Sequence, residues 1–525
     1  MLFRYWLILC LLILFGIYSC TRTEENVLLD DKNEVFMDVT EKAFLARSND
    51  SYSHCLGDID GDGLLDIFVI NHAAPPSLFR NNGDGTFQDI TFNSGVKMRG
   101  DQHGCAIGDY DNDGDQDIYV TVGADSGKGF GSNRLYKNNG EGRFIDVAFE
   151  AGVADTKGRG RSTSWVDYNN DGYLDLFIAN DKRDDAPSVL LNNNGNDSFS
   201  NVSVESGLNI VDHMLEASWV DYDNDGLMDL TTVSFKRHRK WEINIYKNIQ
   251  NGTFKKTKTF NGWTYAWGDY DNDGDLDLFI STPPRVYILG YEFAALAKFF
   301  KGSNKLYENI GEGQFIDVSD KAGIKKEMGG DKAIFFDYDN DGDLDIYLLV
   351  SGTKNKNIND MVFENNGNGT FTNVTREINF IQNVGGRGYD VAYGDYNNDG
   401  FLDLFLTNGS PPYRRMVQYR LGMHSGPYVL YKNKGNGNHW LKIRLVGTKS
   451  NRDGIGARVT LYHGNRFQFR QNGGGMDGYV QHSNFINFGL GDVKIIDKIV
   501  VKWPTGSVSN MTNIKSDQTL IIKEN

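Results

Sequence analysis

The residues best placed to do chemistry in this sequence are aspartates that recur in one spaced pattern. The pattern Asp-x-Asp/Asn-x-Asp-Gly-x-x-Asp occurs seven times between Asp58 and Asp403. Positions 1, 3, 5 and 9 offer side-chain oxygens, position 7 offers a backbone carbonyl, and glycine at position 6 permits a sharp bend. Hard divalent cations prefer several oxygen ligands on a flexible loop. The spacing therefore predicts one Ca²⁺ site in each loop, up to seven in all.

The predicted ligand sets share the same five positions in every loop. They are Asp58, Asp60, Asp62, Leu64 and Asp66; Asp109, Asp111, Asp113, Asp115 and Asp117; Asp167, Asn169, Asp171, Tyr173 and Asp175; Asp221, Asp223, Asp225, Leu227 and Asp229; Asp269, Asp271, Asp273, Asp275 and Asp277; Asp337, Asp339, Asp341, Asp343 and Asp345; Asp395, Asn397, Asp399, Phe401 and Asp403. Two loops carry asparagine at position 3 and so have one carboxylate fewer.

An EF-hand and a plain acidic turn both fit the loops less well. An EF-hand shares the first half of the pattern but needs a glutamate at position 12 and a following helix. Position 12 is apolar or threonine in every loop here, and it lies in a β-type run. A plain acidic turn needs no alternating carboxylates, and unpaired clusters would repel. Calcium is preferred to magnesium because a loop with a carbonyl ligand tolerates irregular coordination, whereas magnesium demands a stricter octahedron.

The overall charge supports bound metal. The chain has a formal net charge of −16, and the loops hold 26 carboxylates at side-chain ligand positions. Seven Ca²⁺ ions would add +14 and nearly neutralise the protein. Metal binding and folding are therefore expected to be coupled, because the empty loops would repel themselves.

The elements around each loop indicate four β-strands per repeat. After each motif comes a short apolar run, such as Ile67–Ile70, typical of a strand covered on both faces. A Leu-Tyr-x-Asn type segment follows, then a glycine-containing turn, then a strand that begins with phenylalanine, such as Phe87. The motifs open 48 to 68 residues apart, a period that suits one propeller blade.

The strand inventory predicts a closed ring. Only six phenylalanine strands follow the seven motifs, and the missing one precedes the first motif at Phe36–Val39. The N-terminal strand is therefore expected to complete the last blade, which hides sheet edges that an open array would expose. The predicted fold class is all-β, a seven-bladed β-propeller over residues 34–437. A small all-β domain is predicted over residues 438–525, from alternating segments such as Leu441–Leu445.

Both parts resemble known families. The loops, with the phenylalanine strands and asparagine-glycine turns, resemble the FG-GAP or VCBS-type repeats of integrin α-like propellers and many bacterial surface proteins. Segments such as Asn451–Val459, Phe488–Gly491 and Val501–Gly506 resemble the ASPIC/UnbV domain, and the combination is similar to the cartilage acidic protein-like family. The resemblance implies a calcium loop between the first two strands of each blade. It implies no established reaction.

The N-terminus predicts export. Leu2 to Tyr18 are apolar except for Arg4, and the run ends at Cys20 before a polar stretch, so residues 1–19 are interpreted as a signal peptide. Gly16–Cys20 resembles a bacterial lipobox, in which cleavage leaves Cys20 as the lipid-bearing first residue of a linker over 20–33. Several acyl chains would anchor the protein stably to the outer membrane, on its surface or its periplasmic face. The alternative is an ordinary signal peptide cut elsewhere.

Cys55 and Cys105 remain in the folded body. They precede their local motifs by three and four residues, which places their side chains on opposite strand faces. Pairing is possible in an oxidising compartment. The preferred expectation is two buried free thiols.

Two long insertions are candidate partner surfaces. They run from 283 to 303 and from 410 to 427, between second and third strands, and are rich in aromatic residues and arginine. The alternative is that the aromatics pack the insertions onto the blades. The candidate contact residues are Tyr287, Tyr291, Tyr413, Arg414, Arg415 and Arg420.

The functional hypothesis is binding rather than catalysis. The acidic balance excludes nucleic acid as a partner, because phosphate binding needs a basic footprint. The histidines show no zinc-type spacing, and the chain has no Gly-x-Ser-x-Gly elbow and no phosphate loop. We expect a lipid-anchored, calcium-binding envelope scaffold that binds a glycan or protein. The alternative is a glycosidase or lyase that acts on polysaccharide.

Overall fold

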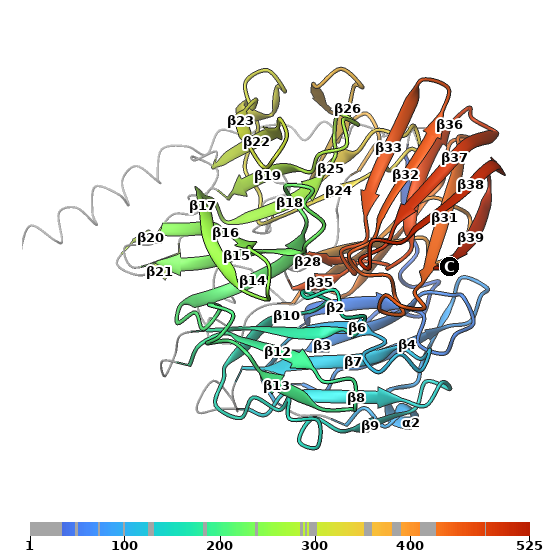
Figure 1. The fold of residues 1–525 in the computed structure, drawn as a ribbon. Helices are drawn as coiled ribbons and strands as arrows, with labels where there is room; N and C mark the ends of the chain where they lie inside the picture. The colour runs from blue at the N-terminus through green and yellow to red at the C-terminus, as the bar shows by residue number, and fades with distance from the viewer. Residues whose placement is uncertain are drawn as a thin grey trace, which may run out of the picture.

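The computed structural model describes residues 34–47, 51–71, 74–97, 100–123, 131–181, 186–236, 240–283, 287–288, 291–292, 302–350, 360–380, 390–409, 427–477 and 479–525. The predicted signal peptide, Cys20 and the linker lie outside these residues. Strands dominate the fold (Figure 1), and the short helices are α2 (Thr91–Ser94) and η4 (Ile324–Lys326). Within the described part of the chain, every helix is too short or too polar to span a membrane.

Most of the strands form antiparallel sheets of four, in which neighbours along the chain pair with one another. Within residues 34–433 the described strands form seven such sets of four, the first of which belongs to a six-stranded sheet with two strands of the C-terminal domain: β2 (Ser51–Gly57), β3 (Asp66–Asn71), β4 (Ser77–Asn81) and β5 (Phe87–Asp89); β6 (Gln102–Gly108), β7 (Asp117–Val122), β8 (Arg134–Asn138) and β9 (Phe144–Asp146); β10 (Gly160–Val166), β11 (Asp175–Asn180), β12 (Val189–Asn193) and β13 (Phe199–Asn201); β14 (His213–Val220), β15 (Asp229–Lys236), β16 (Lys240–Asn248) and β17 (Phe254–Asn261); β18 (Thr264–Gly268), β19 (Asp277–Thr282), β22 (Ser303–Asn309) and β23 (Phe315–Asp317); β24 (Lys332–Phe336), β25 (Asp345–Leu349), β26 (Met361–Asn365) and β27 (Phe371–Asn373); β28 (Asp390–Gly394), β29 (Asp403–Thr407), β30 (Val429–Asn433) and β1 (Phe36–Asp38).

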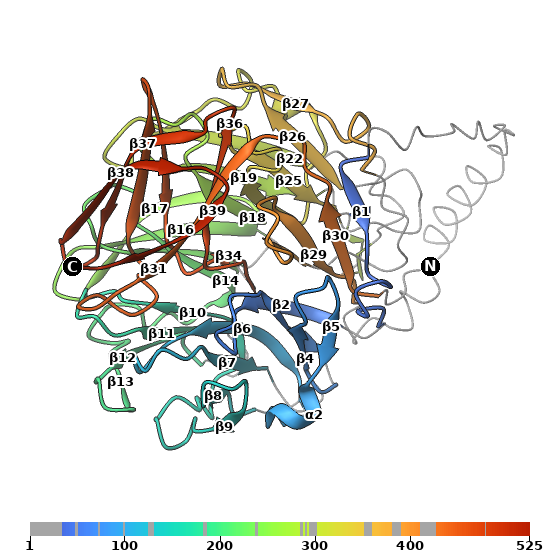
Figure 2. The same ribbon diagram turned by 90° about the vertical axis from the view of Figure 1, so that its right-hand side faces the viewer.

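The sheets close into a ring, and the N-terminal strand completes the last sheet. Phe36 of β1 pairs with Asn433 of β30, as the strand inventory predicts. First strands of neighbouring sheets contact one another, and β2 also contacts β28, so the first strands line the middle of the ring (Figure 2). First and second strands are buried along their whole length in most sheets, which explains their near-continuous apolar runs. The all-β propeller prediction is confirmed.

An asparagine at the end of each third strand joins neighbouring sheets. The side-chain amide of Asn138 donates to the carbonyl of Ile59 in the preceding sheet at 2.7 Å. Asn81 does the same across the ring closure, to the carbonyl of Tyr396 at 2.8 Å. The equivalent residues are Asn193, Asn248, Asn309, Asn365 and Asn433. The asparagines recur in the sequence, but their partners are visible only in the fold.

Cys55 and Cys105 form a disulfide, so the expectation of two free thiols is wrong. Their Cα atoms lie 6.2 Å apart, within the usual span of a disulfide. The cysteines belong to β2 and β6, the first strands of neighbouring sheets, and share one buried cluster. Because neighbouring sheets stack face to face, one face of β2 meets the opposite face of β6. Side chains on opposite faces of their own strands, which seemed to exclude a disulfide, therefore point toward each other across the two sheets.

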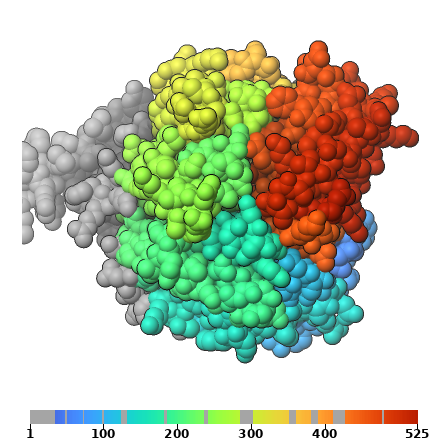
Figure 3. All heavy atoms as spheres, viewed as in Figure 1, coloured from blue at the N-terminus to red at the C-terminus, as the bar shows by residue number. Residues whose placement is uncertain are grey.

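The C-terminal domain is a separate β-structure with its own core. One of its sheets contains β36 (Ile486–Gly491), β31 (His439–Val446) and β39 (Gln518–Lys523), and the other contains β33 (Arg466–Gln471), β32 (Arg458–His463), β37 (Ile495–Lys502) and β38 (Val508–Lys515). Their apolar faces enclose one cluster that includes Leu441, Val459 and Trp503. The domain is seated directly against the ring (Figure 3).

A hairpin of the C-terminal domain enters the middle of the ring. It consists of β34 (Met476–Asp477) and β35 (Val480–Gln481), and it contacts β2, β6, β14 and β28, the first strands of four sheets. Gln481 pairs with Cys55 and exchanges side-chain hydrogen bonds with the backbone of Ile107, at 2.5 and 2.8 Å. The hairpin therefore holds the two domains together at the ring centre.

Candidate metal centres

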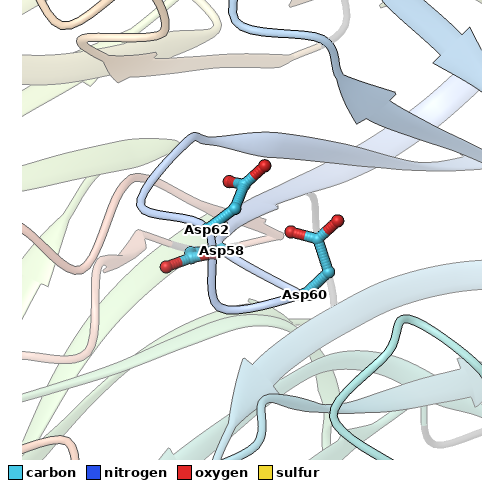
Figure 4. Close-up of side chains that lie close together, drawn as sticks. All are labelled: Asp58, Asp60 and Asp62. Atoms are coloured by element: carbon cyan, nitrogen blue, oxygen red, sulfur yellow. The ribbon is translucent and has the colours of Figure 1, made fainter.

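Each aspartate loop connects the first and second strands of a sheet, as the resemblance implies. In the first loop, Asp58, Asp60 and Asp62 lie close together on one turn (Figure 4). Each of these residues offers a carboxylate oxygen within 4.8 Å of the others. Oxygens that bind one Ca²⁺ at roughly 2.3–2.6 Å are separated by distances of this order. The loop geometry therefore suits a single shared cation.

Four further loops also bring three carboxylates together, from positions 1, 3 and 5 in the fourth and fifth loops and from positions 1, 3 and 9 in the second and sixth. The clusters are Asp109, Asp111 and Asp117; Asp221, Asp223 and Asp225; Asp269, Asp271 and Asp273; Asp337, Asp339 and Asp345. The described residues of the third and seventh loops have an amide in place of one carboxylate. There, the side-chain amides of Asn169 and Asn397 each donate to the position-5 aspartate at 2.8 Å.

The first aspartate of each loop is buried and closes the turn. Asp109 Oδ2 accepts the N–H of Gly114 at 2.8 Å, and its Oδ1 accepts the N–H of Asp113 at 3.0 Å. Position 5 fixes the next residues in the same way, because Asp113 Oδ1 accepts the N–H of Asp115 at 3.0 Å. This hydrogen bond to position 7 recurs in all seven loops and holds the predicted carbonyl ligand beside the carboxylates.

The last aspartate of each loop ties the turn to the sheet. Asp117 Oδ1 accepts the N–H of Asn138 in the third strand at 2.8 Å, and its Oδ2 lies 3.4 Å from the N–H of Tyr110. The strand-to-loop bond is present in every sheet. Position 9 therefore has a structural role in addition to its predicted role as a ligand.

Several loop oxygens are buried without a hydrogen-bond donor among the described residues. They are Oδ1 of Asp58, Asp60 and Asp223 and Oδ2 of Asp229. Burial, together with the neighbouring carboxylates, raises the pKa of Asp117 and of Asp229 to about 9, although hydrogen bonds from the backbone oppose this. A buried carboxylate oxygen without a partner is costly, and a bound cation satisfies it. The oxygen ligands of the loops, including the buried oxygens that accept no hydrogen bond, fit Ca²⁺.

A side-chain link runs from loop to loop around the ring. Position 4 is asparagine in six loops and adopts the left-handed conformation, which asparagine tolerates. Asn112 donates its side-chain amide to the carbonyl of Gly172 in the next loop at 2.9 Å. The equivalent donors are Asn170, Asn224, Asn272, Asn340 and Asn398. The first loop has Gly61 at this position and so makes no such link to the second.

Residues outside the motif give the loops different charges. The residue before the third-strand asparagine faces the loop of its own sheet. Lys247 contacts Asp223 and lies 3.1 Å from Asp225, and Lys432 lies 3.2 Å from Asp399. In the fifth and sixth sheets this position is Glu308 and Glu364, which add a negative charge beside the fifth and sixth loops.

The C-terminal domain directs polar side chains at the first aspartates. Lys442 Nζ lies 2.8 Å from Asp395 Oδ2, and Arg444 Nη1 lies 3.2 Å from Asp58 Oδ2. Three more residues reach the second, third and fourth loops at 3.3 to 3.9 Å: Arg452, Asn451 and Arg458. The sequence does not reveal these contacts, because it does not show which face of the ring the domain covers.

Most of the predicted partner surface falls outside the described residues, where Tyr413, Arg414, Arg415 and Arg420 lie. Tyr287 and Tyr291 belong to a small hairpin of β20 (Tyr287–Ile288) and β21 (Tyr291–Glu292), and only its backbone is described.

Comparisons with known proteins match both parts of the chain. Residues 26–120, 121–178, 167–232 and 337–406 match the family of FG-GAP-like repeats, which together cover more than half of the chain. Residues 447–525 match the ASPIC and UnbV family.

Two relatives are both called cartilage acidic protein 1. The Homo sapiens protein is 28% identical over 212 residues, which are 37% of this chain and 29% of that protein. The Xenopus tropicalis protein is 33% identical over 129 residues, 24% of this chain and 19% of that protein. The match thus spans less than a third of the length of either relative.

Two solved propellers also align with the chain. The Dos1 propeller aligns at 10% identity and a TM-score of 0.34, over 75% of this chain and 96% of that one. The fucose-specific lectin from Aleuria aurantia aligns at 8% identity and a TM-score of 0.34, over 62% of this chain and 96% of that one.

Proposed function

Because the chain belongs to the family of FG-GAP-repeat propellers that end in an ASPIC/UnbV domain, we propose that it is an exported, calcium-stabilised scaffold that binds a ligand. The ligand is a glycan or a protein in the bacterial envelope. The scaffold is held at the outer membrane by lipid on Cys20, on the surface or the periplasmic face.

The observation that carries the calcium proposal is the set of buried, unpaired carboxylate oxygens at the loops. Asp58, Asp60, Asp223 and Asp229 each bury a side-chain oxygen that no described group satisfies. Carboxylates in such numbers would repel one another and lower stability. Calcium supplies the missing charge and the missing coordination together.

Export is supported by the disulfide between Cys55 and Cys105. Disulfides persist in oxidising compartments such as the bacterial periplasm and are rare in the cytosol. This agrees with a lipoprotein signal over residues 1–19. Labelling with a radioactive fatty acid tests the anchor: the wild type carries label in the membrane fraction, and Cys20→Ala carries none. Equal labelling of both proteins would refute lipidation at Cys20.

Binding of a partner is tested with the full chain and an envelope extract. The immobilised calcium-loaded protein is expected to retain one specific glycan or protein, and excess chelator is expected to release it. Arg414→Ala with Arg415→Ala tests the insertion as the contact surface, and Lys498→Ala with Lys502→Ala, on the exposed side of β37, is the matched charge control. Retention that is indifferent to chelator would contradict a calcium-stabilised binding surface.

A further inference from the structure

A cavity of about 180 Å³ lies between the ring and the C-terminal domain. Its floor is formed by the ends of first strands, including Trp267 and Tyr393. The C-terminal domain supplies the other wall, including Arg470, Asn484 and Phe485. The site therefore exists only when both domains are in place.

Arg470 differs from the other basic side chains that face the loops. Lys442, Arg444, Arg452 and Arg458 each lie within 3.9 Å of a first aspartate, whereas Arg470 forms no ion pair with any described residue. Its Nη1 donates to the carbonyl of Phe469 at 2.8 Å, and its guanidinium lies 5.5 Å from the centre of the Phe488 ring. Its Nη2 is buried and has no hydrogen-bond partner in the described part of the chain.

The charges that act most strongly on Arg470 belong to two of the aspartate loops. Asp269 and Asp337 are the carboxylates that act on it most strongly, and both also line the cavity. When their loops hold Ca²⁺, these carboxylates are committed to the cation and no longer neutralise the guanidinium. A buried guanidinium with a free N–H is then a strong site for a carboxylate, which it binds through short, charge-assisted hydrogen bonds.

The remaining lining defines the rest of the ligand. Asn484 and Asn487 offer amides to hydroxyl groups, and Trp267, Tyr393 and Phe485 offer aromatic surface to an apolar ring face. A cavity of about 180 Å³ is small for a ligand site, which suits one sugar ring rather than a chain. We infer that this interdomain cavity binds a single anionic sugar, a hexuronic acid, with its carboxylate on Arg470. This inference rests on the calcium-bound scaffold proposed above and names a ligand class for it.

Calorimetric titration of the calcium-loaded full chain tests the inference. The probes are D-galacturonate and D-glucuronate, with D-galactose and D-glucose as uncharged counterparts. We expect at least one uronate to bind about tenfold or more tightly than its neutral counterpart, because the carboxylate adds charge-assisted hydrogen bonds. Equal affinity for the acid and its neutral counterpart, or no binding of either acid, would overturn the inference.

Two variants locate the site. Arg470→Gln is expected to weaken uronate binding about tenfold or more and to leave any weak neutral-sugar binding unchanged, whereas Arg470→Lys retains part of the affinity. Lys502→Gln removes one exposed positive charge from the same domain and is expected to bind like the wild type. If Arg470→Gln alters the melting curve, Asn484→Ala provides the second test, with an expected loss of about threefold or more. Wild-type affinity in a folded Arg470→Gln protein would place the sugar elsewhere.

A calcium titration of the same samples separates this inference from the proposed function. If the protein binds Ca²⁺ and no uronate, the cavity inference fails and the calcium scaffold stands. If the protein binds no Ca²⁺, the proposed calcium scaffold fails. Uronate binding that persists in excess chelator would contradict the inference that Arg470 becomes available only when Ca²⁺ occupies the neighbouring loops.

Discussion

The sixth loop and the fourth loop have aspartate at the same four side-chain ligand positions but lie in opposite electrostatic settings, and the sixth also has Asp343 at position 7, where the fourth has Leu227. Beside the sixth loop the third strand presents Glu364, whereas beside the fourth it presents Lys247, which contacts Asp223. Burial and the neighbouring carboxylates, Glu364 among them, raise the pKa of Asp339 to about 7. With Glu364, the sixth loop therefore has six carboxylates, whereas the fourth has four carboxylates and an ammonium. Loops that share the same four side-chain ligand positions are thus expected to differ in calcium affinity.

Complete removal of calcium is expected to have the largest effect, on all loops at once. A site held at a hundred times its Kd contributes about 2.7 kcal/mol of stability, so several sites together shift the melting temperature by many degrees. Differential scanning calorimetry with excess chelator measures the shift, and added calcium should reverse it. A melting curve that chelator leaves unchanged would refute calcium as a structural ion.

Glu524 in the C-terminal domain differs from the loop carboxylates, because hydrogen bonds alone satisfy its two oxygens. Glu524 Oε2 accepts the backbone N–H groups of Thr448, Lys449 and Ser450 at 2.7 to 3.0 Å, and its Oε1 accepts hydroxyl groups that include that of Thr505. Burial raises the pKa of Glu524, but these hydrogen bonds outweigh it and hold the pKa well below its usual range.

Glu524→Gln is therefore expected to destabilise the C-terminal domain by about 2 kcal/mol at neutral pH, with or without calcium. A lowered folded-state pKa stabilises the fold above the unfolded value of about 4.3, and this contribution is lost as the pH falls below it. Urea denaturation at pH 7 and at pH 3 checks both statements. The difference between the variant and the wild type should be smaller at pH 3 than at pH 7, because the contribution shrinks below the unfolded pKa and vanishes only below the folded pKa. A constant difference would contradict the assignment.

Neutralising the third-strand residue tests the comparison of loops directly. Glu364→Gln is expected to weaken the calcium affinity of the sixth loop about tenfold, because it removes one negative charge beside the cation site. Lys247→Gln is the matched change of opposite sign and should strengthen binding at the fourth loop. Calcium titration by calorimetry measures both. If the two variants shift affinity in the same direction, the charge outside the motif does not control binding.

The smallest expected effect concerns the missing link between the first and second loops. Gly61 has a φ of 72° with open space around its missing Cβ, so asparagine fits there as it does in the other six loops. Gly61→Asn is expected to stabilise the calcium-loaded protein by roughly 0.5–1 kcal/mol through a bond to the carbonyl of Gly114. Gly63→Asn, at the sixth position of the same loop, supplies no link and should destabilise it. Urea denaturation distinguishes the two.

Much of the fold and of the metal centres could be predicted from the sequence. The loops, the strands that flank them and the return of Phe36 to the last sheet follow from local spacing and from the count of strand types. Such features depend on residues that are close in the chain or on a repeat whose copies can all be recognised in the sequence. The hydrogen bonds that Asp109 accepts are local in the same way, because their donors, Asp113 and Gly114, lie in the same nine-residue turn.

Contacts between distant parts of the chain required the folded structure. The disulfide of Cys55 with Cys105 was predicted wrongly because pairing depends on how two sheets stack, and strand faces alone do not determine that. The third-strand residue Glu364 had no assigned role, since its distance to the loop arises from the pairing of strands.

The sequence by itself therefore determined the spacing of the acidic loop residues, from which the calcium sites are predicted, and that strands from both ends of the propeller meet. Only the tertiary structure decided what surrounds the metal loops. The C-terminal domain covers one face of the ring, so Lys442 and Arg444 reach aspartates far away in the chain while Arg470 faces a cavity instead. The physical reason is that the docking of two domains depends on the shape and charge of whole surfaces. The spacing of residues along the chain does not predict these properties.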